Sequence, residues 1–235
     1  RRVTGTAASY EQTGNVLFDR LFGTTLEFHP SGLDMNAETM AATERLRAEG
    51  HRPYFIPGGG SNEIGALGYV SCAQEIVDQS ALMGVQFDWI VMATGSTGTQ
   101  AGLVAGLFAL DYPLPVAGIS VRQPRDKQIE AVYGLTVRTL EKIGAGQLPT
   151  GTITVDDGYV GEGYGSPAES TLEAIDLAAK LEGLLLDPVY SGKGFAGLVG
   201  LARQNFFKPM DNVLFLHTGG ATALFAYEEA LLPAN

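Results

Sequence analysis

The segment that begins at residue 94 combines residue types suited to binding phosphate. The apolar run from Phe87 to Ala93 is followed by the loop Thr94–Thr99 (TGSTGT) and then by a helix-forming stretch from Gln100. Such a loop brings hydroxyls and backbone N–H groups together at the positive end of a helix dipole. A phosphate is the natural ligand of that arrangement. The alternative for the loop alone is a tight turn without a ligand.

Two tyrosines and one threonine stand in other loops where they could contact a ligand. Tyr164 lies between two glycines, and Tyr190 lies in the segment Asp187–Lys193. A phenol there could transfer a proton or position a substrate, or could simply pack with its hydroxyl hydrogen-bonded. Thr218 follows an apolar run, and its neutral hydroxyl could bond a heteroaromatic nitrogen without protonating it.

The sequence gives little support for known nucleotide-binding or hydrolase motifs. The stretch Gly192–Gly197 matches G-x-G-x-x-G, but five residues including Pro188 separate it from the expected strand, whereas that motif needs a tight turn. Small residues that let a helix pack closely on a sheet explain it better. A phosphate-binding P-loop fails because Asp187 stands where its first glycine is required. No G-x-S-x-G is present, so serine hydrolase chemistry has no support.

Apolar β-rich runs alternate with helical patterns, which is typical of an α/β fold with a mostly parallel sheet. We predict helices over 14–22, 35–50, 65–80, 101–110, 127–143 and 170–183, and strands over 25–28, 54–56, 87–93, 115–121, 152–155, 184–186 and 213–216. Ser170 and Glu173 are expected to form a capping box at the last helix. Ligands bind outside the carboxyl ends of such strands, so the loops starting at Thr94, Asp187 and His217 should share one sheet edge.

Composition excludes several functions. The 235 residues are 45% hydrophobic and 17% charged, as in ordinary globular proteins, and the net charge of −11 argues against nucleic acid as a partner. The single cysteine, Cys72, allows no internal disulfide, fits a reducing cytoplasm and is expected in the core. The three histidines show no metal-ligand spacing, so no metal site is predicted. No apolar run approaches the length of a membrane span.

Six motifs occur in an order that resembles the aminocyclopropane-carboxylate (ACC) deaminase / D-cysteine desulfhydrase family. They cover most of the chain: Ile56–Asn62, Leu67–Tyr69, Thr94–Gly102, Gly163–Gly165, Leu185–Lys193 and Phe215–Gly220. The resemblance implies a pyridoxal-phosphate (PLP) enzyme of fold type II, similar to tryptophan synthase β, with open, mostly parallel sheets in two domains. Residues 1–57 would be the remnant of the small domain and 58–235 the large PLP-binding domain, with a junction near Pro57.

The resemblance also assigns roles to single residues. The residues that would bind the cofactor are Gly95, Ser96, Thr97, Gly98 and Thr99 around its phosphate, and Thr218 at its pyridine nitrogen. Tyr164 and Tyr190 would face a small amino-acid substrate and assist proton transfer. The family further implies a cytoplasmic homodimer or larger homo-oligomer, with no nucleic-acid or membrane partner.

The reaction expected from the resemblance is a β-elimination. ACC deaminases of this family tend to carry a glutamate after the second tyrosine, whereas Ser191 stands here, which disfavours ring opening. The segments 31–38, 121–128 (with Arg122 and Lys127) and 161–170 look most like L-cysteate sulfo-lyase, which releases pyruvate, sulfite and ammonia. Arg122 could meet the sulfonate or be a surface charge. The alternatives are D-cysteine desulfhydrase, then ACC deaminase, then a non-catalytic module that binds a phosphate ligand.

The family's Schiff-base lysine has no counterpart in this sequence. It lies in an Asn-Lys-Thr-Arg-Lys motif that precedes a Gln-Ser-Asn-His substrate-carboxylate motif, and neither occurs here. Lys193 belongs to a different motif and is not its replacement. We therefore expect that the N-terminal portion of the parent protein is missing, and that this chain alone does not hold the cofactor covalently.

Overall fold

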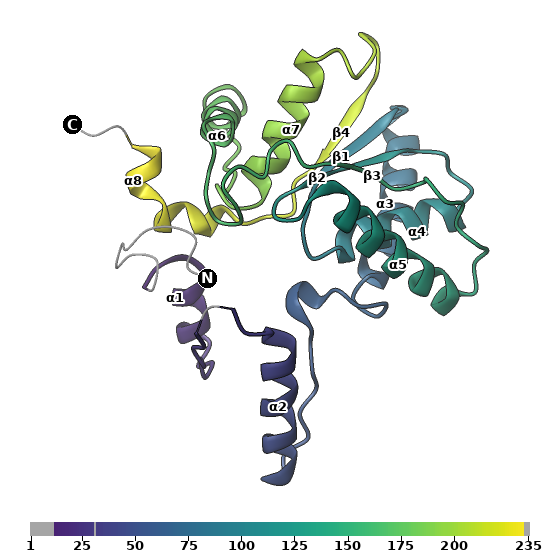
Figure 1. Ribbon diagram of the computed structural model, residues 1–235. Helices are drawn as coiled ribbons and strands as arrows, with labels where there is room; N and C mark the ends of the chain where they lie inside the picture. Colours follow the sequence, from purple (N-terminus) through teal and green to yellow (C-terminus); the bar gives the residue numbers. More distant parts are fainter. Residues whose placement is uncertain (1–11, 31, 233–235) are drawn as a thin grey trace.

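A four-stranded parallel sheet forms the centre of the structure, a computed structural model that describes residues 12–30 and 32–232 (Figure 1). The strands are β1 (Trp89–Thr94), β2 (Val116–Ser120), β3 (Thr154–Asp156) and β4 (Val213–Leu216). Their order is β3-β2-β1-β4, and every pairing is parallel. The predicted α/β class with a parallel sheet is confirmed.

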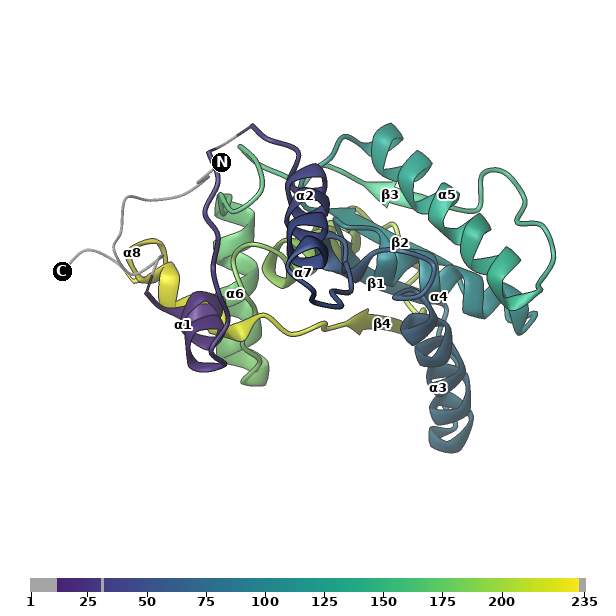
Figure 2. The ribbon, with the colours of Figure 1, turned by 90° about the horizontal axis from the view of Figure 1, so that it is seen from below.

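Helices cover both faces of this sheet. The α-helices are α1 (Gly14–Leu21), α2 (Met35–Ala48), α3 (Leu67–Met83), α4 (Gly98–Ala109), α5 (Arg125–Ile143), α6 (Glu169–Glu182), α7 (Ser191–Arg203) and α8 (Glu228–Leu231), and the 3-10 helices are η2 (Gly58–Gly60) and η3 (Ala221–Ala226). Helices α4 and α5 lie on one face with α3 outside them, and α7 lies on the other with α6 beside it. Helix α1 contacts η3, whereas α2 projects away from the sheet (Figures 1 and 2).

Strand β1 is buried on both faces, which explains its continuous apolar sequence. Ile90 and Met92 belong to the core under α4 and α5, and Val91 belongs to the core under α7; all three are fully buried. The alternation follows from the period of two along a strand. The central strand therefore packs against the helices on both faces of the sheet.

Two glycines let α7 lie directly on the sheet. A Cβ at Gly194 would come within 2.9 Å of the Ala93 Cβ, and a Cβ at Gly197 within 2.5 Å of the Ile119 side chain. The prediction that the glycines of 192–197 serve close helix–sheet packing is confirmed, because both positions have no room for a side chain.

Replacing Gly102 by alanine should force α3 and α4 apart. Its Cβ would lie 2.3 Å from the Ala66 carbonyl oxygen and 2.6 Å from the Tyr69 Cβ. We expect a loss of about 1–3 kcal/mol in the free energy of unfolding, measured by denaturant titration. Gly68→Ala on α3 is the matched control, since nothing lies within 4 Å of its Cβ. Equal stabilities of the two variants would contradict this packing.

Three predicted strands and one predicted cap are wrong. Residues 25–28, 54–56 and 184–186 run without sheet pairing in the structure, because their apolar side chains have no neighbouring described strand to join. Leu184 and Leu185 are exposed, and only Leu186 is buried. The capping box also fails, since α6 begins one residue before Ser170 and Glu173 instead pairs with Arg203.

Some sequence predictions lie partly outside the described residues. The structure does not describe residue 31 of the motif at 31–38. It also does not describe residues 1–11 and 233–235 at the ends of the two expected domains. Cys72 is half-buried on α3 rather than fully in the core, and burial, then the charge of Glu75, raises the pKa of its thiol. Among the described helices, none is long and apolar enough to cross a membrane.

Candidate active site

The strand order creates a crevice beside β1. From β1 the chain passes through α4 to β2 on one side, whereas β4 pairs with β1 on its other side. Loops that leave the carboxyl ends of β1 and β4 therefore diverge, and such a switch point is where open α/β sheets bind ligands. The loop after β1 begins at Gly95, and the loop after β4 holds Thr218.

The loop after β1 offers backbone donors to an anion. Thr97, just before α4, has φ +80°, and its side chain does not cap the helix. Within the described residues, the backbone N–H groups of Ser96, Thr97 and Thr99 have no hydrogen-bond acceptor. These donors surround the positive end of the α4 dipole, so the loop can bind a phosphate.

Two glycines of the loop are required by close contacts. A Cβ at Gly95 would lie 2.9 Å from the Val121 Cγ2 and 3.2 Å from the Tyr190 Cε2. The Gly98 N–H donates to the Ser61 hydroxyl at 3.1 Å, and a Cβ there would lie 3.3 Å from the Ser61 Cα. Larger residues would displace the loop from the tyrosine on one side and from the Pro57–Asn62 segment on the other.

The segment Pro57–Asn62 supports the loop. A Cβ at Gly59, whose φ is +67°, would lie 2.3 Å from the Ser96 hydroxyl. In the sequence, this segment belongs to the family motif Ile56–Asn62 and to the expected domain junction near Pro57, and the domain boundary stays a prediction. The contacts of Gly59 with Ser96 and of Ser61 with Gly98 show that this segment also supports the loop after β1.

The predicted site residues surround two neighbouring cavities. The first, of about 520 Å³, is lined by Thr99, Tyr164, Tyr190 and Thr218. The second, of about 950 Å³, shares the two tyrosines and adds Gly95, Ser96 and Thr97. The structure thus brings together every predicted site residue, with Gly98 beneath the loop against Ser61 rather than at a cavity wall.

Tyr190 is held as a neutral phenol. Burial raises the pKa of Tyr190 well above its usual value, and the nearby Tyr164, Tyr69 and Asp187 groups add to the shift, against the opposing effect of a backbone hydrogen bond from Gly95. A phenol that keeps its proton can donate a hydrogen bond or a proton but cannot act as a base near neutral pH. Tyr69, from the motif Leu67–Tyr69, also lines the smaller cavity, a position that was not predicted from the sequence.

The raised pKa of Tyr190 should appear in alkaline stability. Because the unfolded chain loses this proton from about pH 10 and the folded chain does not, the folded state loses stability as pH rises above 10. Tyr190→Phe should therefore lose less stability than the parent between pH 9 and pH 11, about 1 kcal/mol less per pH unit above 10. Unfolding free energies across this range test it. Tyr54→Phe, at an exposed tyrosine, is the control, and identical slopes for both variants would refute the argument.

Asp187 organises the site, a role that was not predicted from the sequence. Its buried carboxylate accepts hydrogen bonds from the backbone N–H groups of Val189, Tyr190 and Ser191 at 2.7–2.9 Å, and from the Ser191 hydroxyl at 2.6 Å. It also packs against the loop after β4, since a Cβ at Gly220 would lie 2.5 Å from its Oδ2. Asp followed by Pro and, four residues on, by Ser is a capping signal that could have revealed it. The segment from 187 precedes α7 instead of following a strand.

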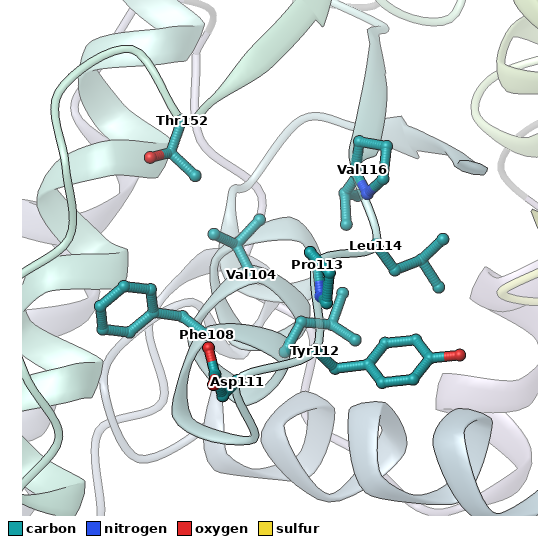
Figure 3. Close-up of a pocket in the computed structure, with 10 residues that line it drawn as sticks. Val104, Phe108, Asp111, Tyr112, Pro113, Leu114, Val116 and Thr152 are labelled. Carbon is teal, nitrogen blue, oxygen red and sulfur yellow. The ribbon is translucent and has the colours of Figure 1, made fainter. Parts of the chain in front are cut away.

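A further cavity of about 330 Å³ lies at the opposite end of the sheet (Figure 3). Figure 3 shows Val104, Phe108 and Leu114 around it, close to Val116, the first residue of β2. None of the predicted site residues lines it. Among the described residues, no group of three or more His, Cys, Asp or Glu is placed to hold a metal ion.

The parallel sheet and the loop after β1 are those of an α/β protein that can bind a phosphate-bearing ligand at the switch point. A family model described as pyridoxal-phosphate dependent enzyme matches residues 3–219, and the chain belongs to this family. It is 42% identical to D-cysteine desulfhydrase of Serratia proteamaculans over 219 residues, which are 93% of the chain and 66% of the relative.

Solved structures agree with this assignment. The chain matches a crystal structure described as an ACC deaminase homologue with 35% identity and a TM-score of 0.84, over 94% of this chain and 66% of that one. O-ureido-L-serine synthase, at 18% identity and a TM-score of 0.56 over 88% of this chain and 61% of that one, shares the fold alone. The fold is thus PLP fold type II within the ACC deaminase / D-cysteine desulfhydrase family. The chain spans 66% of the length of its two more similar relatives.

Proposed function

We propose that the protein carrying this chain is a PLP-dependent carbon–sulfur lyase that acts by β-elimination, with D-cysteine as its substrate. The observation that carries the proposal is the 42% identity to D-cysteine desulfhydrase over 93% of the chain. The reaction converts D-cysteine and water to pyruvate, hydrogen sulfide and ammonia. The finer L-cysteate assignment from the sequence becomes the second candidate.

The residues present fit the cofactor. Ser96, Thr97 and Thr99 would donate backbone N–H groups to its phosphate, and close contacts at Gly95 and Gly98 leave no room for a side chain at those two positions. Thr218 would place its neutral hydroxyl at the pyridine nitrogen. When bound, PLP supplies an electron sink for negative charge at the substrate α-carbon.

Tyr190 and Tyr164 would act on the substrate. Both line the two cavities, and Tyr190 keeps its proton near neutral pH. We infer that the Tyr190 hydroxyl donates a hydrogen bond to the sulfur as the carbon–sulfur bond breaks, and that the Tyr164 phenol orients the amino acid. Because the Ser191 hydroxyl donates to Asp187 at 2.6 Å and is buried, position 191 supplies no acid or base for ring opening.

L-cysteate is the second candidate because of two cations. Arg122 and Lys127 line the larger cavity together with both tyrosines, and neither forms an ion pair with another described residue. In a chain of net charge −11, a local pair of free cations would favour an anionic group such as a sulfonate.

A substrate panel tests these proposals. The holoenzyme is given D-cysteine, L-cysteate and ACC, and pyruvate, sulfide, sulfite and a four-carbon 2-oxo acid are measured. Pyruvate with sulfide from D-cysteine is expected. Release of pyruvate and sulfite from L-cysteate, at a rate that Arg122→Met lowers at least tenfold, would favour the second candidate. A four-carbon 2-oxo acid alone, or no product, would refute carbon–sulfur lyase activity.

A further inference from the structure

One lysine is completely buried next to the candidate active site. Lys193, in the first turn of α7, has 0% of its side chain exposed. Its ammonium donates hydrogen bonds to the carbonyl oxygens of Val160 at 2.6 Å and of Gly163 at 2.7 Å. No carboxylate among the described residues forms an ion pair with it.

Burying an ammonium without a counter-ion is costly, so its contacts must compensate. Burial lowers the pKa of Lys193, which shows the direction of that cost. By contrast, Lys180 on the neighbouring helix α6 and Arg203 at the end of α7 itself are exposed and pair with carboxylates. The two carbonyl contacts are therefore the feature that distinguishes Lys193, and both belong to one loop.

That loop carries Tyr164. Gly161, Gly163 and Gly165 have φ values of +65°, +147° and +83°, conformations that favour glycine and leave many alternatives to the unrestrained chain. Lys193 holds the backbone before Tyr164, and the Tyr227 hydroxyl holds the backbone after it by donating to the Gly165 carbonyl at 2.9 Å. The loop is thus fixed on both sides of the tyrosine.

We propose that Lys193 is a positioning residue, whose ammonium fixes residues 160–163 and thereby sets the Tyr164 phenol in the cavities that it lines together with Tyr190. Its catalytic consequence rests on the function proposed above, whereas its effect on the loop does not. Both carbonyl bonds engage the ammonium inside the protein, away from the cavity walls, so Lys193 acts through Tyr164 and does not touch the substrate.

Hydrogen–deuterium exchange of the holoenzyme tests the effect on the loop. Lys193→Met keeps the length of the side chain and removes both donors, so amides of residues 158–166 should exchange about tenfold faster or more. Arg203→Met, at an exposed cation of the same helix, should leave them unchanged. Unchanged exchange in Lys193→Met would overturn the proposal. If that variant unfolds globally, Lys193→Gln, which keeps two amide donors, should restore protection of this loop, and failure to do so would count equally against it.

A double-mutant cycle tests the route through Tyr164. Lys193→Met should lower kcat at least tenfold in the parent but cause no further loss in a Tyr164→Phe background. Multiplicative losses in the double variant would overturn the positioning role. If the parent holoenzyme shows no lyase activity, the proposed function fails, and the exchange measurement still decides the role of Lys193.

Discussion

Replacing Asp187 by alanine is expected to destabilise the protein by about 3 kcal/mol or more and to abolish activity. The change leaves the partly buried backbone N–H groups of Val189 and Tyr190 and the buried one of Ser191 without their acceptor. It also removes the surface against which Gly220 packs. Because Tyr190 and the loop that holds Thr218 would both shift, affinity for the cofactor and turnover should fall together. Denaturant unfolding and cofactor absorbance measure the two effects.

An exposed helix cap provides the matched control. Asp34 accepts from the backbone N–H groups of Asn36 and Ala37 at the start of α2, as Asp187 does before α7. Asp34→Ala removes the same chemical group where water can replace it, so it should cost only about 1 kcal/mol. If Asp187→Ala lost no more unfolding free energy than Asp34→Ala, the burial of Asp187 and its contacts in the site would add nothing to stability.

Replacing Thr99 by aspartate should weaken PLP binding by roughly a thousandfold without weakening the fold. Thr99 lies in the first turn of α4, where a carboxylate interacts favourably with the helix dipole and should add about 0.3–1 kcal/mol of stability. The same carboxylate would repel the cofactor phosphate by about 4 kcal/mol at 4 Å and an effective dielectric constant of 20. Titration of the apoenzyme with PLP measures the affinity, and thermal unfolding measures the stability.

Two controls isolate the charge. Thr99→Asn has the shape of aspartate without the charge and should bind PLP within about tenfold of the parent. Pyridoxal, which lacks the phosphate, should bind to the aspartate and asparagine variants equally. If Thr99→Asp and Thr99→Asn bound PLP alike, the loop after β1 would not be the phosphate site.

The sequence sufficed for the parts of the fold that depend on strong local patterns. The apolar runs that form β1 and β2 are long and bounded by glycine or polar residues, so they are recognisable without knowledge of their neighbours. The loop after β1 and the glycines of α7 could also be interpreted, because small residues at these positions have few other physical explanations.

Features that depend on tertiary partners could not be predicted in the same way. Residues 184–186 have a strand-like composition but pair with none of the described strands, and Glu173 pairs with Arg203 on another helix instead of capping its own. The role of Lys193 depends on carbonyls more than 29 residues away in sequence. The residue types singled out the loop after β1, Tyr164, Tyr190 and Thr218, the family resemblance assigned their roles toward PLP, and the fold explains why their loops meet.

The most direct test of the account is the stoichiometry of products from D-cysteine. The reconstituted holoenzyme should release pyruvate and sulfide in equal amounts, and Thr99→Asp should release neither at a PLP concentration that saturates Thr99→Asn. Sulfide without pyruvate, or full activity of Thr99→Asp under those conditions, would contradict a carbon–sulfur elimination that depends on the cofactor phosphate held after β1.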